Sequence, residues 1–244
     1  MHFHLPKPLH GWRAFAGEVG IIVLGVLIAL GLEQVVSAIH DRASAAQTRD
    51  SIHAEMADNL HIVLNRQRTE DCLQRRLREI AGFLDARSEG KHPPRPTWIG
   101  APYAPLLGDT SFRSAQSAGK FFLLSQDKQQ QIDVFYVDSD DFNVQSTREW
   151  YDWAQFRSLT SPGTRLADTE VTRLRQALQD ARGADWLVRI DITDFVRLAR
   201  SEGVTAVRRG GVADYQLASA CLPMNMPYAE AVGKTGRDGV PYPE

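Results

Sequence analysis

The chain has 244 residues and carries 28 lysines and arginines against 30 aspartates and glutamates, a formal net charge of -2. Because a nucleic-acid-binding face must neutralise phosphates with basic residues, this balance predicts no nucleic-acid partner. The only cysteines, Cys72 and Cys221, are too few for a disulfide scaffold and have no metal-binding spacing. They form either one bridge, if their domain lies outside the cytoplasm, or two buried thiols.

An apolar run from Val19 to Leu32 lies between Glu18 and Glu33. As a helix the run is about 21 Å long, which is short of a hydrocarbon core of about 30 Å. Apolar flanks lengthen it enough to span, and the small-residue stretch "ASA" at 43–45 lies too far past the run for signal-peptide cleavage. We therefore predict a stub over 1–11 and an uncleaved transmembrane anchor over 12–40.

Charges on the two sides of the anchor predict its orientation. Lys7 and Arg13 precede the apolar run, whereas the residues after it mix acidic with basic side chains. By the positive-inside rule, the stub stays in the cytoplasm and the rest of the chain is exported. The expected location is a bacterial inner membrane, with the N-terminus cytoplasmic and the C-terminal domain periplasmic or otherwise extracytoplasmic.

The pattern of the anchor is Gly17-Glu18, an apolar stretch and then "GVLIAL" at 25–30. This pattern resembles the N-terminal signature of a family of uncharacterised bacterial single-pass membrane proteins. The likeness is strongest over 11–65 and weaker over 111–136, and it departs from the family at "LEQ" (32–34), where members carry a polar Gln/Asn stretch. The resemblance implies an anchor that runs straight into a long charged helix, and it implies no activity.

One face of the anchor carries small residues in a regular pattern. Steps of four and three residues from Glu18 select a seam on which Gly25 and Ala29 form a small-x-x-x-small pair, where two helices can approach closely in lipid. Glycine is also common in membrane helices that do not pair. The seam predicts a parallel homodimer through the anchor, and its residues are Glu18, Ile22, Gly25, Ala29, Leu32 and Val36.

Helical periodicity continues along the rest of the chain and predicts an all-α fold. Apolar residues recur at three and four over 43–86, and no proline between Arg13 and Pro93 prevents the anchor from continuing into this helix. We expect a proline-rich loop over 91–109 and then helices from Ser125 to about 160, over 168–181 and over 185–202. Together these elements make one helical extracytoplasmic domain over 41–203, followed by a loose C-terminal segment over 204–244.

No stretch of the sequence has the spacing of a catalytic, cofactor-binding or metal-binding motif, so we predict a protein that is not an enzyme and needs no cofactor. The aromatic residues Trp150, Trp153 and Phe156 form either a stacking platform for a ligand or part of the core.

These patterns predict a membrane-anchored, non-enzymatic interaction or scaffold module of the bacterial cell envelope. Its expected partners are the lipid bilayer, a second copy of the chain and an unidentified envelope protein. The alternative is an extracytoplasmic ligand-binding sensor domain that acts through a partner protein.

Overall fold

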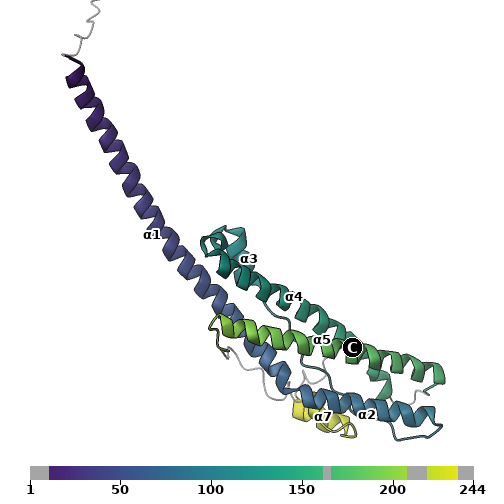
Figure 1. Ribbon diagram of the computed structural model, residues 1–244. Coiled ribbons are helices and arrows are strands. Elements are labelled where there is room, and N and C mark those ends of the chain that lie inside the picture. Colours follow the sequence, from purple (N-terminus) through teal and green to yellow (C-terminus); the bar gives the residue numbers. More distant parts are fainter. Residues whose placement is uncertain (1–10, 162–165, 208–218, 236–244) are drawn as a thin grey trace, which may run out of the picture.

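The computed structural model describes residues 11–161, 166–207 and 219–235, and every regular element within these ranges is a helix. The predicted all-α fold is therefore confirmed. Figure 1 shows one long helix, α1 (Gly11–Arg68), that projects from one end of an elongated helical bundle. The expected stub up to residue 10, and residues 208–218 and 236–244 of the expected C-terminal segment, lie outside the described residues.

The two halves of α1 have different surroundings. Its first half is exposed from Phe15 to residue 43, and its most apolar 18-residue window has a mean hydropathy of 2.4. Within the described residues it is the one helix long and apolar enough to cross a membrane. The second half turns Ile52, Met56 and Val63 into the bundle core. Because no break separates the halves, the prediction that the N-terminal apolar helix continues into the helix of the domain is confirmed.

The helix expected over 43–86 is interrupted once, at Thr69. There the backbone N–H and the hydroxyl of Thr69 both donate to the carbonyl of Arg66, at 3.1 and 2.8 Å. The chain resumes as α2 (Glu70–Ser88) and leaves the helix near Gly90, whose φ of +78° suits the predicted stop. The stretch 91–109 contains no helix or strand, as predicted.

The rest of the bundle comprises α3 (Thr110–Ser117), the 3-10 helix η1 (Lys120–Leu123), α4 (Gln126–Gln155), the 3-10 helix η2 (Phe156–Leu159) and α5 (Asp168–Ser201). Figure 1 shows α4 and α5 side by side and antiparallel. The prediction of two helices over 168–181 and 185–202 was wrong, because α5 continues through Gly183. A glycine costs a helix interior only about 1 kcal/mol relative to alanine, and packing of the residues around Gly183 offsets it.

Two apolar clusters fill the bundle, one on each side of the break at Thr69. The first joins the second half of α1 to α3, η1, α4 and α5, and its large members include Ile52, Met56, Phe121, Phe135, Phe142 and Phe195. The second joins α2 to the end of α4, η2 and the start of α5, through Leu73, Leu77, Ile80, Trp153, Phe156 and Leu174. Full burial of each such side chain stabilises the fold by roughly 1.5–3 kcal/mol.

Part of the C-terminal segment packs on the bundle, in contrast to the loose segment expected over 204–244. The 3-10 helix η3 (Ser219–Cys221) contacts α2, and the short helix α7 (Tyr228–Thr235) follows it. Ala220 and Ala231 are buried. Helices this short show no repeating apolar pattern, so the periodicity of the sequence did not indicate them.

Candidate functional site

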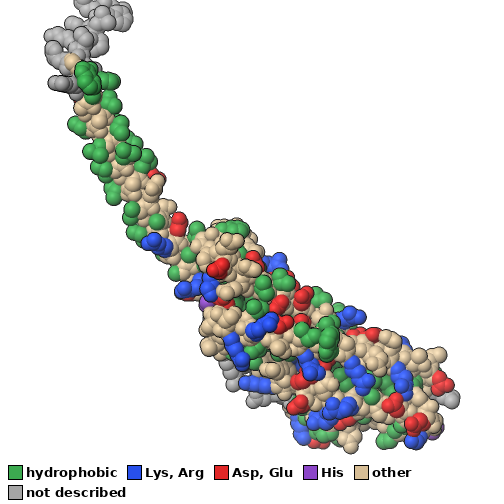
Figure 2. All heavy atoms as spheres, in the orientation of Figure 1, with side chains coloured by type: hydrophobic (Ala, Val, Ile, Leu, Met, Phe, Trp, Pro, Cys, Tyr) green, Lys and Arg blue, Asp and Glu red, His purple; other side chains and the backbone are tan. Residues whose placement is uncertain are grey.

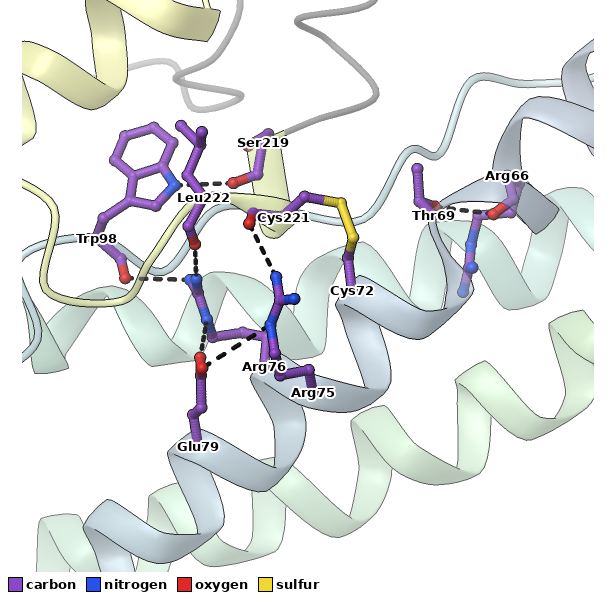
Figure 3. Close-up of a disulfide and its surroundings, with 10 residues drawn as sticks. All are labelled: Arg66, Thr69, Cys72, Arg75, Arg76, Glu79, Trp98, Ser219, Cys221 and Leu222. Carbon is purple, nitrogen blue, oxygen red and sulfur yellow. Dashed lines mark hydrogen bonds and ion pairs between the residues drawn. A yellow bond between two sulfur atoms is a disulfide. The ribbon is translucent and has the colours of Figure 1, made fainter.

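A disulfide between Cys72 of α2 and Cys221 of η3 attaches the C-terminal segment to the bundle (Figure 3). The two Cα atoms lie 4.7 Å apart, within the range that a disulfide bridges. Of the two alternatives for the cysteines, the structure has the bridge. Bridges of this kind persist in oxidising compartments outside the cytoplasm.

Arg76 holds two chain segments beside the disulfide (Figure 3). Its guanidinium is fully buried; Nη1 donates to the carbonyls of Trp98, at 3.1 Å, and Ile99, and Nη2 donates to the carbonyl of Leu222. Burial lowers the pKa of Arg76, and an ion pair of 2.8 Å from Nε to Glu79 opposes that shift. Arg76 thus joins α2 to the loop that contains Trp98 and Ile99 and to the segment that follows η3.

Trp98 and Gly100 bring the proline-rich loop against η3. The indole Nε1 of Trp98 donates to the carbonyl of Ser219 at 2.8 Å. Gly100 has a φ of +71°, and a Cβ at this position would overlap the same carbonyl. Only glycine combines this backbone conformation with so close an approach.

A second buried cluster of charges lies at the break between α1 and α2. The Nη2 atom of Arg66 donates to Glu149 of α4 at 3.0 Å and to Asp185 of α5 at 2.8 Å. Its Nη1 donates to Glu70 of α2 at 3.1 Å. One side chain thus joins all four long helices, and the side chains of Arg66, Glu149 and Asp185 are all buried.

The cluster holds three carboxylates around one fully buried cation. Burial is the largest influence on Glu149 and, together with the charges of Asp185 and Glu70, it outweighs Arg66 and raises the pKa of Glu149 to about 7. Oε2 of Glu149 has no hydrogen-bond partner among the described residues. Burial works against the charge of Arg66, but the surrounding carboxylates raise its pKa, so the guanidinium stays charged.

A polar cleft lies between α1 and the α3–η1 region. Its volume is about 360 Å³, and its wall contains hydroxyl, amide and amine groups. The lining residues are Gln47, Thr48, Ser51, Thr110, Ser111, Ser114, Ala115, Ala118 and Lys120. These groups can donate hydrogen bonds to a small polar ligand.

Large apolar side chains are exposed on the neighbouring helices α4 and α5, and we name this set the outer α4–α5 face: Val137, Val144 and Tyr151 of α4, and Trp186 and Ile190 of α5. The α4 residues are seven apart and therefore follow one stripe of the helix. Trp186 is 58% exposed and borders a groove of about 250 Å³ whose wall also includes Arg148 and Leu187. Exposed tryptophans beside grooves are typical of protein-binding surfaces.

The predicted aromatic platform does not exist as an accessible surface. Trp153 and Phe156 have 0% exposure and belong to the second apolar cluster, while Trp150 is half-buried and packs on Tyr151 at 5.3 Å between ring centroids. The face of α4 that carries Trp153 is the face that packs into the bundle. Of the two alternatives, the core is the correct one for Trp153 and Phe156.

The residues of the predicted anchor seam are all exposed on the first half of α1: Glu18, Ile22, Gly25, Ala29, Leu32 and Val36. The seam is thus free to contact a second helix, and the parallel dimer stays a prediction. In the part of the chain that the structure describes, no group of three or more His, Cys, Asp or Glu side chains is arranged to hold a metal ion.

Sequence reasoning missed the outer α4–α5 face. Trp186 and Ile190 are four residues apart, on a stripe that lies between the buried positions of α5 such as Asp185, Val188 and Ile192. This offset from the buried stripe is the signal that could have marked the two residues as exposed. Comparisons with protein-family models, with curated proteins and with solved structures found no match to this chain.

Proposed function

We propose that this protein is a single-pass membrane protein of the bacterial cell envelope whose exported helical domain is a non-enzymatic interaction or scaffold module. One observation carries the proposal: the first half of α1 is apolar and entirely exposed, while the second half of the same helix forms the bundle core. A lipid bilayer is the environment in which such an apolar helix is stable. The disulfide supports an exported, oxidising location for the domain.

The outer α4–α5 face supports an interaction role for the exported domain. Single apolar residues on a surface are ordinary, whereas Trp186 with its groove, Ile190 one turn away and the stripe of α4 gather on neighbouring helices. A partner helix or strand that covered this face would remove the tryptophan from water and fill the groove. We assign the face to an envelope protein partner on this basis.

Fusion of reporter enzymes after Glu244 tests the location. A reporter that is active only in the periplasm should work there, and one that is active only in the cytoplasm should be silent. Resistance to alkaline carbonate extraction should show that the protein is integral to the membrane. The reverse reporter pattern would contradict the proposed orientation, and release by carbonate would contradict the anchor.

Co-purification of matched variants from the native host tests the interaction face. Trp186→Ala should lose an envelope protein that the unmodified chain retains, because the indole would provide much of the buried contact area. Tyr228→Ala is the matched control, because Tyr228 is an aromatic residue with the same 58% exposure but belongs to α7 and not to α4 or α5. The same set of retained proteins for all three chains would contradict the assignment.

The second candidate is the ligand-binding sensor, and the polar cleft is the observation that favours it. A ligand in the cleft would contact α1 at Gln47, Thr48 and Ser51, on the helix that leads into the proposed membrane anchor. Thermal unfolding with inorganic phosphate as a probe tests this function. A stabilisation that disappears in Lys120→Gln would favour the sensor over the scaffold.

A further inference from the structure

We propose that the turn between α3 and α4 rests on the lipid surface of the membrane that holds α1. We name Ala118–Leu124 the membrane-facing turn. This inference rests on the proposed membrane anchor, and it adds a second, peripheral contact between the domain and the bilayer. Its apolar members Phe122 and Leu123 would lie among the lipid headgroups and the upper part of the acyl chains.

The domain begins a short distance along α1 from the end of its apolar half. The apolar half of α1 extends to Ile39, and the first residues of α1 that the domain partly covers are Ser44 and Ala45. Ser44 lies five residues after Ile39, a rise of about 7.5 Å. The headgroup layer on one side of a bilayer is about 5–8 Å thick. The domain therefore begins within about the thickness of the headgroup layer from the end of the apolar half of α1.

The part of the domain at this height is the α3–η1 region. Both α3 and η1 pack against α1, and Figure 1 shows α3 at the end of the bundle closest to the free half of α1. The other end of α4 lies about 37 Å further along that helix, at Tyr151. Figure 2 shows hydrophobic side chains on the surface of this near end of the domain.

The turn carries apolar side chains that the fold itself does not bury. Phe121 points inward and packs edge-on against Phe112, at 5.3 Å between ring centroids. The next two residues point outward, with Phe122 67% exposed and Leu123 39% exposed. Lys120 is exposed in the same turn, where its stem can lie along apolar surface while its ammonium reaches a lipid phosphate. Phe and Leu beside Lys are typical of interfacial segments.

Glu55 of α1 binds α3 and α4, which flank the turn. These contacts fix the position of the turn along α1. The backbone N–H of Ser111 donates to Oε2 of Glu55 at 2.7 Å, and that of Phe112 donates to Oε1 at 3.3 Å. The hydroxyl of Tyr136 on α4 donates to the same carboxylate at 2.6 Å. Because α1, α3 and α4 meet at Glu55, the turn moves with the anchor and not independently of it.

The structure provides a clean labelling strategy for the test. The described part of the chain contains no free cysteine, because Cys72 and Cys221 are bridged, so one introduced cysteine is the only reactive thiol. The full chain is reconstituted into vesicles of phosphatidylcholine and phosphatidylglycerol and labelled with a small fluorophore at Phe122→Cys. Quenching by lipids that carry a nitroxide near the headgroup end of the acyl chain measures contact at the surface of the bilayer, and a nitroxide near the terminal methyl of the chain does the same for a residue at the centre of the bilayer.

Two further labelled positions serve as controls. Tyr151→Cys replaces another exposed aromatic residue, 62% exposed, at the far end of α4. Ile28→Cys lies in the apolar half of α1. We expect at least an approximately twofold loss of fluorescence at Phe122→Cys and at Ile28→Cys, and none at Tyr151→Cys, if the turn lies within the interfacial layer.

Each other outcome overturns the inference in a distinguishable way. Quenching at Ile28→Cys without quenching at Phe122→Cys means that the anchor is correct and the domain stands clear of the lipid. Equal quenching at Phe122→Cys and Tyr151→Cys means that the domain lies on its side and the turn has no special role. Absence of quenching at Ile28→Cys removes the proposed anchor together with the inference.

Discussion

Arg66 is a fully buried cation between the buried carboxylates Glu149 and Asp185, and this arrangement couples the fold to pH. The pKa of Glu149 is raised to about 7, well above the value of 4.5 for an unperturbed glutamate. A group whose pKa is raised in the folded state adds stability at pH values below its unfolded pKa. That stability is lost as the pH rises through the folded pKa. The contribution of Glu149 to the stability of the fold is therefore lost between about pH 4.5 and pH 7.

Replacement of Glu149 with glutamine should flatten this pH dependence. The amide keeps an oxygen for Arg66 and carries no charge, so the variant should be at least as stable as the unmodified chain at pH 8. Between pH 5.5 and pH 8 the unmodified chain should lose about 2 kcal/mol more stability than the variant, as the shift to about 7 implies. Thermal unfolding in detergent over this range measures the difference.

Asp191 leaves a residual pH dependence in the same direction. Burial and the charges of Asp141, Asp138 and Asp194 raise its pKa to about 6. The Glu149→Gln variant should retain the smaller loss of stability that Asp191 causes. This loss should occur at a lower pH than the loss that Glu149 causes. Identical pH profiles for the variant and the unmodified chain would contradict the assignment to Glu149.

Two glycines have the same backbone conformation but different surroundings. Comparison of their alanine variants distinguishes the cost of a strained backbone from the cost of a close contact. Gly100 has a φ of +71° against the carbonyl of Ser219, whereas Gly119 has a φ of +69° and a Cβ added there would meet nothing within 4 Å. Gly119→Ala should cost about 1–2 kcal/mol of unfolding free energy, from the left-handed backbone alone. Gly100→Ala should cost about 3 kcal/mol or more, because overlap with the backbone adds to that strain. Equal losses in denaturant unfolding would show that the close approach relaxes freely.

At the scale of the element, the register of α1 relates the anchor to the domain. Gly25 lies 27 residues before Ile52, and Ala29 lies 27 residues before Met56. At 3.6 residues per turn this separation is about 7.5 turns, so the small residues and the core-facing residues lie on opposite sides of one helix. The bundle therefore lies on the far side of α1 from the anchor seam and does not obstruct a second anchor there.

This register sharpens the test of the predicted dimer. Gly25→Leu should weaken self-association in a membrane reporter assay, because the larger side chain separates two closely packed backbones. Gly20→Leu should have little effect, because Gly20 lies off the seam on the side that leads to the bundle. Insertion into the membrane should be normal for both variants. Equal and negligible effects would mean that the anchor is monomeric.

The sequence predicted the helices better than their interruptions. The start of α4 after Ser125 and the uninterrupted course of α1 follow from helical spacing and from the absence of proline. The break at Thr69 has no proline or glycine to mark it, since it depends on hydrogen bonds from Thr69 to Arg66. The sequence predicts two helices, over 168–181 and 185–202, where the structure has one, because sequence alone does not show the packing that carries α5 through Gly183.

Contacts across the whole molecule decide which side of a helix faces the core. The sequence alone therefore predicted the candidate sites less well than it predicted the helices. Trp153 continues the buried stripe of α4, whereas Trp186 lies between the buried positions Asp185 and Val188 of α5. The first tryptophan is fully buried and the second is mostly exposed. Which stripe of a helix faces the core depends on contacts such as that of α5 with α2, between segments distant in the sequence. The pairing of Cys72 with Cys221 remained one of two alternatives for the same reason.

Reduction of the disulfide tests how the C-terminal segment contributes to the whole molecule. The bridge closes a loop of 149 residues, and loss of such a bridge typically costs about 2–5 kcal/mol. Reductant, or the paired change Cys72→Ser and Cys221→Ser, should lower the unfolding temperature. Hydrogen exchange should rise first at Thr97 and Trp98, whose N–H groups donate to the carbonyl of Met224. Unchanged exchange there would mean that hydrogen bonds, such as those of Arg76 and Trp98, hold the segment without the bridge.

Because α1 is uninterrupted, a tilt of its apolar half moves the far end of the helix. Arg68 lies about 65 Å along the helix from Gly25, near the middle of the apolar half. Transmembrane helices tilt to match the thickness of their bilayer, so a change of 10° in the anchor would swing the far end of α1 by roughly 11 Å. With no hinge between Gly11 and Arg68, a thinner or thicker bilayer would sweep the outer α4–α5 face sideways and carry it towards or away from a neighbouring protein.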